Sequence, residues 1–251
     1  MSKKSFGGNI VSKVSLDKTG ITHFSTGEYE YFSCLIENGR EVEINTLSSF
    51  TIAAVMQNPD TELSIPDLNR NIESGEIIQS ENLSVTLKAS GGQARLLIAG
   101  SVNSVCSDRK ITFTKAQDVY KVVKPWGYEL WLNKQHPDYA FKNIFIKKGT
   151  KTSLQFHRFK KETNLVYSGK TLLHYKHNDR VENEDAKPED INTVLVESIT
   201  AIDVSPSIVH RLEALTDILL YETSTPHLDD VIRIDDDTNR KNGKIISEHK
   251  A

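Results

Sequence analysis

The sequence has few cysteines and no long apolar run. Its 251 residues include only Cys34 and Cys106, which cannot build a disulfide framework and do not have metal-ligand spacing. The first residues are basic but lack the apolar core of a secretory signal, and no apolar stretch is long enough to span a bilayer. These absences predict a cytoplasmic protein in a reducing compartment, with no membrane partner.

An excess of basic residues is also missing. Lysine and arginine total 31 against 34 acidic residues, which gives a formal net charge of −3. A broad nucleic-acid surface usually carries a basic excess, and no helix-turn-helix pattern is visible, so we expect no nucleic-acid partner. A small anionic substrate remains compatible with this balance, because two or three local basic residues are enough to bind one.

Long stretches with helical periodicity are hard to find. The chain consists instead of short β-branched or alternating segments separated by turn sequences such as Asn38-Gly39. The expected strands are 42–44, 50–56, 83–87, 95–99, 128–132, 141–146, 154–157, 164–167, 171–175, 193–196, 201–204 and 218–222. One short helical turn is expected within 65–72. Many short strands at near-regular spacing predict an all-β sandwich or barrel.

A change in composition divides the chain into two halves. It follows Lys115, and the sequence Lys124-Pro125-Trp126-Gly127 then interrupts the strand pattern. We therefore expect two β domains, residues 1–118 and 119–251, with a boundary near 118–124.

Four candidate metal ligands lie in two stretches of the second half. Gln155 and His157 are two residues apart and therefore project from the same face of a strand. Glu162, beyond a short turn, and His210, on a returning strand, can complete a pocket of nitrogen and oxygen donors. Such a set suits a divalent transition metal such as zinc. The alternative is that all four are ordinary polar residues on separate surface strands.

The two halves show a weak internal similarity. Residues 34–40 resemble 164–170, and residues 94–98 resemble 216–220, at a similar separation. On this alignment, the positions of Gln155, His157 and Glu162 fall near Ser25, Gly27 and Phe32. Seven of the eight histidines also follow residue 130. The first domain is therefore expected to lack a metal site.

The second half resembles the cupin domain of type II mannose-6-phosphate isomerases. The resemblance runs from about Lys124 to Arg240 and depends on four motifs in the right order. These are Lys124-Pro125-Trp126-Gly127, the Ser-Leu-Gln-x-His stretch at 153–157 with Glu162 and Gly169, His210-Arg211-Leu212-Glu213, and Leu228-Asp229-Asp230-Val231-Ile232-Arg233. The resemblance implies a double-stranded β-helix, the cupin or jelly-roll barrel. The nucleotidyltransferase often fused to these isomerases is absent, and the first half is expected to be a second, degenerate cupin barrel, giving a bicupin.

The resemblance also implies a ligand set. Phosphomannose isomerases hold zinc through a glutamine, a histidine, a glutamate and a second histidine, which correspond here to Gln155, His157, Glu162 and His210. Manganese, iron or nickel would also be compatible. Many cupins carry another histidine ligand where this chain has Phe159. That departure removes one common cupin ligand but leaves the glutamine-containing set whole.

The implied reaction is interconversion of an aldose phosphate and a ketose phosphate through an enediolate. Glu222 is the expected base, Arg233 the expected active-site cation, and Lys160 a group able to meet substrate oxygens. Each has a plainer alternative: Glu222 as a solvated carboxylate at a strand end, Arg233 in a structural salt bridge to Asp229 or Asp236, and Lys160 as a surface lysine.

Two further residues are candidates for binding substrate. Arg211 follows His210 directly and points to the opposite face if this stretch is a regular strand. It can then support the site or bind phosphate from a loop, and its role stays open. Asp230 belongs to the motif that precedes Arg233. The acidic run 235–237 lacks the glycine and the distal glutamate of an EF-hand loop, so a solvated turn is expected there.

Three functions remain open at this point. The first is a metal-dependent sugar-phosphate isomerase with a small-molecule substrate. The second is a non-catalytic bicupin that binds a sugar or a sugar nucleotide, which Phe159 and the empty first domain favour. The third is another carbohydrate-modifying cupin, an epimerase or dehydratase, because one fold hosts many reactions. A homodimer is also expected, because cupin barrels often pair through their outer strands.

Overall fold

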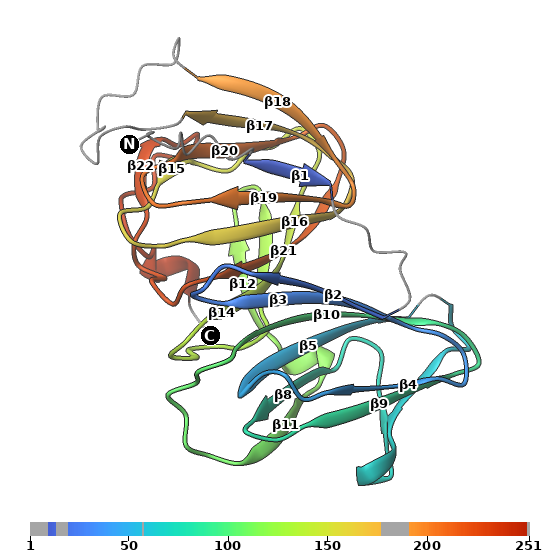
Figure 1. Cartoon of the computed structure of the whole chain (residues 1–251). Coiled ribbons are helices and arrows are strands. Elements are labelled where there is room, and N and C mark those ends of the chain that lie inside the picture. Colours follow the sequence, from blue (N-terminus) through green and yellow to red (C-terminus); the bar gives the residue numbers. More distant parts are fainter. Residues whose placement is uncertain (1–9, 14–19, 57, 177–190, 250–251) are drawn as a thin grey trace, which may run out of the picture.

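The computed structural model describes residues 10–13, 20–56, 58–176 and 191–249. The described chain forms four antiparallel sheets that build two barrels, which lie against one another in Figure 1. In that view the second half of the chain, green-yellow to red, forms the upper barrel and the first half forms the lower one. Among the described residues, no helix has the length and apolar character needed to cross a membrane.

Two sheets form the upper barrel. The seven-stranded sheet contains, in spatial order, β1 (Val11–Lys13), β19 (Thr200–Val204), β16 (Glu162–Ser168), β21 (Ile218–Ser224), β14 (Ala140–Ile146), β13 (Gly127–Trp131) and β12 (Tyr120–Lys124). The five-stranded sheet contains β18 (Asn192–Glu197), β17 (Lys170–Lys176), β20 (Val209–Ala214), β15 (Leu154–Phe156) and β22 (Ile232–Asp235).

The lower barrel has the same two-sheet plan. Its six-stranded sheet contains β11 (Lys110–Thr114), β8 (Ile77–Glu81), β5 (Ser49–Met56), β10 (Ala94–Ser101), β3 (Glu30–Ile36) and β2 (Gly20–Ser25). Its four-stranded sheet contains β4 (Glu41–Ile44), β9 (Val85–Ser90), β6 (Glu62–Ile65) and β7 (Arg70–Ile72). The part of the chain that the structure describes also has short 3-10 helices: η1 (Pro66–Leu68), within the expected turn at 65–72, η2 (Ala116–Asp118) and η4 (Ile246–His249).

The topology corrects the alignment of the two halves. In the upper barrel β16 lies between β21 and β19, and in the lower barrel β5 lies between β10 and β8. The equivalent of β16 is therefore β5, whereas the similarity of 34–40 to 164–170 had matched it with β3. The match of 94–98 with 216–220 pairs β10 with β21 and agrees with the topology. Ser25, Gly27 and Phe32 are therefore not the counterparts of the candidate ligands.

Strand β1 crosses from the first half of the chain into the upper barrel. It pairs with β19, with Val11 opposite Ile202, and the neighbouring Ile10 packs in the upper barrel's apolar core. In Figure 1 this dark blue strand lies among the orange and yellow strands of the second half. Strand β1 therefore belongs to the upper barrel and not to the expected first domain, residues 1–118, because its backbone hydrogen bonds are made with β19.

The two barrels share an apolar layer between their large sheets. It combines outward-facing residues of both halves, among them Tyr29 and Leu97 from the lower barrel and Phe141 and Tyr221 from the upper one. Polar links cross the same layer, including a hydrogen bond of 2.9 Å between Tyr29 Oη and Thr163 Oγ1. The face of the sheet opposite to this layer is the interior of each barrel, where a functional site would lie.

Candidate metal centre and its cavity

Three of the four expected ligands come together inside the upper barrel. Glu162 begins β16, His210 is the second residue of β20, and His157 follows β15 in the turn that leads to β16. Glu162 Oε1 lies 3.2 Å from His210 Nε2, and Glu162 Oε2 lies 3.5 Å from His157 Nε2. Donor atoms from all three residues lie within 4.8 Å of one another, and all three residues are buried.

The hydrogen bonds of the two histidines determine which nitrogen faces Glu162. His157 donates from Nδ1 to the carbonyl oxygen of Asp230, and His210 donates from Nδ1 to the carbonyl oxygen of Ile208 over 3.0 Å. Because a neutral imidazole carries one hydrogen, each Nε2 presents a lone pair to the carboxylate. His157 Nε2 is buried and has no hydrogen-bond partner. Lone pairs and a carboxylate facing one another repel unless a proton or a metal ion lies between them.

The protonation states fit a metal as that cation. Burial lowers the pKa of His157, which favours its neutral form, although Glu162 opposes the shift. Burial alone would raise the pKa of Glu162, but the neighbouring Lys160 ammonium holds that pKa well below its usual range. Two neutral imidazoles and a carboxylate are ligands that zinc and its neighbours accept, and backbone partners on Nδ1 are usual for such histidines.

A second cluster with the same residue types fails this test. Glu81, Cys106 and His136 also place donor atoms within 4.8 Å of one another. There, however, the amide of Asp138 donates to His136 Nδ1 over 3.2 Å, so the hydrogen sits on Nε2. That nitrogen lies 3.0 Å from Glu81 Oε1 and donates to it. Both nitrogens of His136 are therefore used in hydrogen bonds and offer no lone pair to a metal, although Glu81 Oε2 is buried without a hydrogen-bond partner.

Gln155, the fourth expected ligand, lies at the wall of the same cavity. It is paired with His210 across β15 and β20, and its Oε1 accepts a hydrogen bond of 2.8 Å from Ser153. The structure therefore brings Gln155 to the wall of the cavity that the three converging residues share, and its role as fourth ligand stays a prediction. Asn164, which sequence reasoning missed, donates from Nδ2 to Glu162 Oε1 over 3.0 Å and orients that carboxylate. Its position two residues after Glu162 on one strand was the available signal.

The cavity around this group has a volume of about 110 Å³. Since a water molecule in the liquid occupies roughly 30 Å³, the space exceeds one water several-fold. Besides the four candidate ligands, its walls include Lys160, Glu222 and Arg233 from the sequence predictions. The carboxyl-terminal segment contributes to the same walls through Gly243 and His249. The cavity thus joins the metal-ligand group to the groups expected to handle protons and charge.

Lys160 and Glu222 are both buried, so neither is a solvated surface group. Lys160 Nζ contacts Glu162 Oε2 and lies 2.8 Å from Glu222 Oε1. Burial alone would lower the pKa of Lys160, but the two carboxylates raise it above its usual range. Lys142, another residue missed by sequence reasoning, approaches Glu222 Oε1 to 3.2 Å. The expected base is therefore held between two ammonium groups.

These contacts begin a chain of ion pairs that leads away from the candidate ligands. Charges alternate along it in the order Glu162, Lys160, Glu222, Lys142, Glu129, Lys124, Glu248, Arg240 and Asp236. Beyond the Lys160 contacts, successive links measure 3.2, 3.8, 3.5, 2.8, 3.4 and 2.6 Å. We call this set the charge chain. It ties the floor of the cavity to the carboxyl-terminal segment.

Arg233 lies at the cavity wall and is held by backbone carbonyls. Its Nη1 donates to the carbonyl oxygens of Lys241 and Gly243, the latter over 2.9 Å, while its Nε is buried without a hydrogen-bond partner. The alternative salt bridge to Asp236 is not made, because Asp236 pairs with Arg240 at 2.6 Å. Within the described residues Arg233 makes no ion pair, so its positive charge is not neutralised by a carboxylate.

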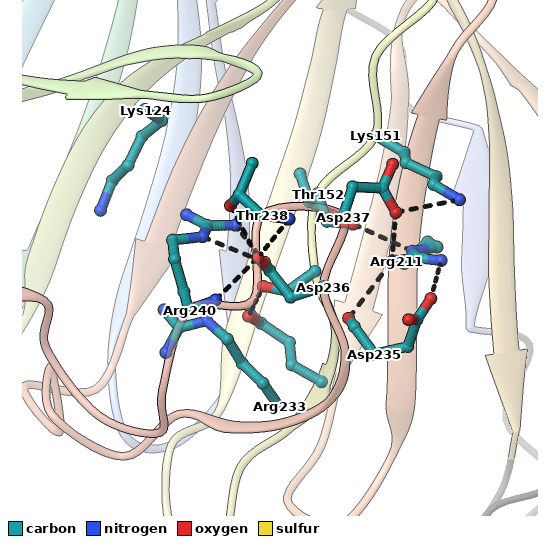
Figure 2. Close-up of polar contacts among 12 residues, drawn as sticks. Lys124, Lys151, Thr152, Arg211, Arg233, Asp235, Asp236, Asp237, Thr238 and Arg240 are labelled. Atoms are coloured by element: carbon teal, nitrogen blue, oxygen red, sulfur yellow. Dashed lines mark hydrogen bonds and ion pairs between the residues drawn. The ribbon is translucent and has the colours of Figure 1, made fainter.

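Arg211 lies outside the cavity, on the opposite face of β20 from His210. Its Nη1 bonds Asp235 Oδ2 over 2.9 Å and its Nε donates to the carbonyl oxygen of Thr152 over 2.9 Å. Figure 2 shows it beside Asp235 and Asp237, with Arg240 and Asp236 on the other side of the same turn. The alternation on the strand was predicted, but a substrate-binding role does not fit this position. The acidic run is paired with cations, and Asp235 and Asp237 remain more than half exposed, in agreement with the expected solvated turn.

Asp230 also differs from its expected position. Its carboxylate accepts hydrogen bonds from the backbone amides of Arg158, Phe159 and Lys160, over 3.0, 2.6 and 2.8 Å. Burial alone would raise the pKa of Asp230, but these three amides lower it. Both carboxylate oxygens are therefore used within the protein, and the residue acts on the turn that carries His157 and not on a substrate.

The lower barrel has apolar residues where the upper one has charges. Glu222 is the third inward-facing residue of β21, and Ile98 is the third of β10. Glu162 and Phe50 each pair with the residue two positions further along these strands. Ile98 and Phe50 are fully buried in an apolar core. At these two positions, the lower barrel cannot supply a base or a carboxylate ligand.

Comparisons with known proteins agree with the fold. No protein-family model matches the chain, and no curated protein matches its sequence. Solved structures do match. An oxalate decarboxylase of Lactobacillus farciminis, in a formate complex, has a TM-score of 0.63 at 10% identity over 92% of this chain and 90% of its own.

Two further structures show how broad this likeness is. An IolB-like protein from Salmonella typhimurium has a TM-score of 0.60 at 11% identity, covering 96% of this chain and 98% of its own. A vicilin from Corylus avellana has a TM-score of 0.55 at 6% identity, covering 80% and 76%. At such identities the likeness shows the fold alone. The expected fold class is confirmed: the chain has the bicupin fold, with two double-stranded β-helix barrels in tandem.

Proposed function

We propose that this bicupin is a metal-dependent isomerase that interconverts an aldose phosphate and a ketose phosphate in the upper barrel. One observation supports this most strongly. The lone pairs of His157 and His210 meet the Glu162 carboxylate in a cavity that also contains a second carboxylate, Glu222. A metal site and a separate base are the two requirements of such a reaction.

His157, Glu162 and His210 would hold the metal, with Gln155 available as a fourth ligand from the cavity wall. Zinc suits this set best, and manganese, iron or nickel is also compatible. When bound, the metal supplies a Lewis acid that polarises the substrate carbonyl. The remaining steps fall to the side chains of the chain itself.

Glu222 would take the proton from the carbon next to the carbonyl and return it to the neighbouring carbon. The Lys160 ammonium, 2.8 Å from Glu222 Oε1, can donate a hydrogen bond to the oxygen on which negative charge develops. Arg233, whose charge no described carboxylate neutralises, is suited to an anionic group such as a phosphate. Each proton removed is returned, so the reaction needs no oxidant or reductant.

The test combines metal analysis with proton exchange. Purified protein is expected to contain about one metal ion per chain and to exchange the carbon-bound proton of an aldose or ketose phosphate in heavy water. Glu222→Gln should lower the exchange rate by at least about 100-fold, since a positioned base contributes roughly that much or more. Oxalate belongs in the same screen, because several structural neighbours are named oxalate decarboxylases.

Variants separate the metal site from the fold. His157→Ala should lose the metal and the exchange while keeping its cooperative unfolding. His174→Ala is the matched control, since His174 bonds Glu213 over 2.8 Å outside the cavity and should change neither. Protein that stays metal-free after exposure to zinc, manganese, iron and nickel would count decisively against the proposal.

A second candidate function is a bicupin that binds a sugar or a sugar nucleotide without turning it over. The ion pairs of Glu222 favour it, because its Oε1 already contacts the ammonium groups of both Lys160 and Lys142 and is less free to reach a substrate proton. This function predicts thermal stabilisation by a sugar phosphate with no proton exchange. The two candidates share the metal site and differ only in the exchange measurement. The homodimer and the cytoplasmic location stay predictions for either function.

A further inference from the structure

The turn from His157 to Lys160 has little packing of its own. Arg158 and Phe159 are exposed, and Phe159 keeps 65% of its surface accessible. Yet this turn must place His157 opposite Glu162 and Lys160 beside it, within a few tenths of an ångström if a metal is to be bound. Some contact other than apolar burial must therefore hold it.

Besides the amide of Ser207, which donates to the carbonyl oxygen of His157 over 2.7 Å, one residue from a distant part of the sequence holds the turn from both sides. The Asp230 carboxylate accepts the amides of Arg158, Phe159 and Lys160 over 2.6 to 3.0 Å. Hydrogen bonds to an ionised acceptor are about twice as strong as neutral ones. The carbonyl oxygen of the same residue accepts Nδ1–H of His157. Side chain and backbone of Asp230 thus fix the turn and the imidazole together.

Asp230 is itself held in position. Its amide donates to the carbonyl oxygen of His227 over 3.2 Å, which closes a turn just before β22. β22 in turn pairs with β15, the strand that leads into the His157 turn. The two segments are therefore joined by a strand pair at one end and by Asp230 at the other.

We propose that Asp230 is the positioning residue of the metal centre: its carboxylate sets the turn, and its carbonyl holds His157 with Nε2 toward Glu162. The inference depends on the proposed metal site and adds to it a residue that touches neither metal nor substrate. Without the carboxylate, three amides lose their acceptor, and the turn that carries His157 and Lys160 relaxes. Outer partners of metal ligands typically change metal affinity by about 10- to 100-fold.

The test measures zinc affinity in metal-stripped, full-length protein by competition with a chromogenic chelator. Asp230→Ala should bind zinc about 10- to 100-fold more weakly than the unchanged protein. Asp230→Asn should be intermediate, because an amide oxygen accepts hydrogen bonds but carries no charge. Asp229→Ala, which removes the neighbouring exposed carboxylate, is the matched control and should bind as the unchanged protein does.

Hydrogen exchange of the backbone amides tests the same proposal in the absence of metal. In the stripped protein, the amides of residues 158 to 160 should exchange faster in Asp230→Ala than in Asp229→Ala, while β16 and β20 keep their protection. If Asp230→Ala does not fold, Asp230→Asn decides by the same two measurements.

The outcomes separate the two proposals. An unchanged protein that binds no zinc rejects the metal centre. An unchanged protein that binds zinc, with Asp230 variants of equal affinity and equal exchange, rejects the positioning role alone. Weaker binding together with faster exchange confined to the turn supports it.

Discussion

At the scale of single residues, the candidate centre depends on which nitrogen of each histidine carries the hydrogen. Carbonyl oxygens fix that hydrogen on Nδ1 in His157 and His210, whereas an amide fixes it on Nε2 in His136. By residue type and distance alone, both clusters are equally good candidates for a metal site. The hydrogen-bond partner on the far side of the ring separates a metal-binding histidine from a structural one.

A prediction at this scale concerns Glu129. It is buried near the ammonium groups of Lys124 and Lys142 and accepts a hydrogen bond of 2.8 Å from Trp131. Burial alone would raise the pKa of Glu129, but these neighbours lower it from 4.5 to about 2. Its folded pKa lies below the unfolded one, so its stabilisation is complete above about pH 4.5 and is lost as the pH falls toward 2.

The measurement is the free energy of unfolding by urea at pH 7, 5 and 3. Between pH 7 and 3 the unchanged protein should lose roughly 2 kcal/mol more than Glu129→Gln, because pH 3 lies about 1.5 units below the unfolded pKa and each unit is worth about 1.4 kcal/mol. Glu41→Gln, in an exposed pair with Lys88, is the control and should follow the unchanged protein. Parallel curves for Glu129→Gln and the unchanged protein would contradict the assignment.

The sequence predicted part of the site at this scale. His157, Glu162 and His210 could be predicted because the family motif fixes their residue types and spacing, and because strand alternation shows which side chains share a face. Asp230 was expected to bind substrate, whereas its carboxylate binds backbone amides. These partners could not be predicted, because every residue except proline has a backbone amide. Lys142 and Glu129 were missed because their charges meet only after the strands have paired.

At the scale of elements, the Trp126-Gly127 motif has a structural reason. Gly127 begins β13 with φ of +153°, and a Cβ atom there would lie 2.0 Å from the carbonyl oxygen of Phe145 on the neighbouring strand β14. Only glycine allows that close approach. The motif that marks the family resemblance thus serves to bring β13 against the strand that carries Lys142.

Gly127→Ala should accordingly destabilise the protein by about 2 to 4 kcal/mol, combining overpacking with an unfavourable backbone conformation. The matched control is Gly149→Ala, at φ of +77° with open space around the added Cβ, which should cost only about 1 kcal/mol. Thermal unfolding followed by circular dichroism compares the two. Equal losses would show that the approach to Phe145 does not matter.

The positions of strands with a clear apolar alternation were predicted well, whereas the pairing between strands far apart in the sequence was not. The expected 50–56 and 141–146 match β5 and β14 to within a residue, because apolar alternation is a local property. The alignment of the halves went wrong because β3 and β16 have similar apolar patterns, and local pattern does not encode which neighbours a strand takes. Strand β1 could not be placed for the same reason.

At the scale of the whole molecule, the two barrels depend on one another. The apolar layer between them buries Phe141, Leu165 and Tyr221 of the upper barrel, and β1 reaches across to cover the edge of β19. The site itself lies entirely in the upper barrel. One contribution of the lower barrel is therefore physical, since it covers one outer face of the barrel that carries the cavity.

Residues 119–251 expressed alone should therefore fail to form a stable barrel. The fragment would expose the apolar layer and an unpaired edge of β19, both of which favour aggregation. The full chain should unfold in a single calorimetric transition, while the fragment should bind a hydrophobic dye and show none. A fragment that unfolds cooperatively near the temperature of the full chain would show that the barrels are independent.

The charge chain has a consequence for how this sequence can vary. Every interior member touches two partners of opposite sign, so replacing Lys142 alone leaves Glu129 and Glu222 without the cation between them. A buried carboxylate that loses its partner is costly, whereas a concerted exchange at neighbouring links preserves the alternation. Substitutions at neighbouring positions of the charge chain should therefore occur together. Among related proteins, residues 129, 142 and 222 should covary as one unit, while Ile98, the lower-barrel counterpart of Glu222, should vary independently of them.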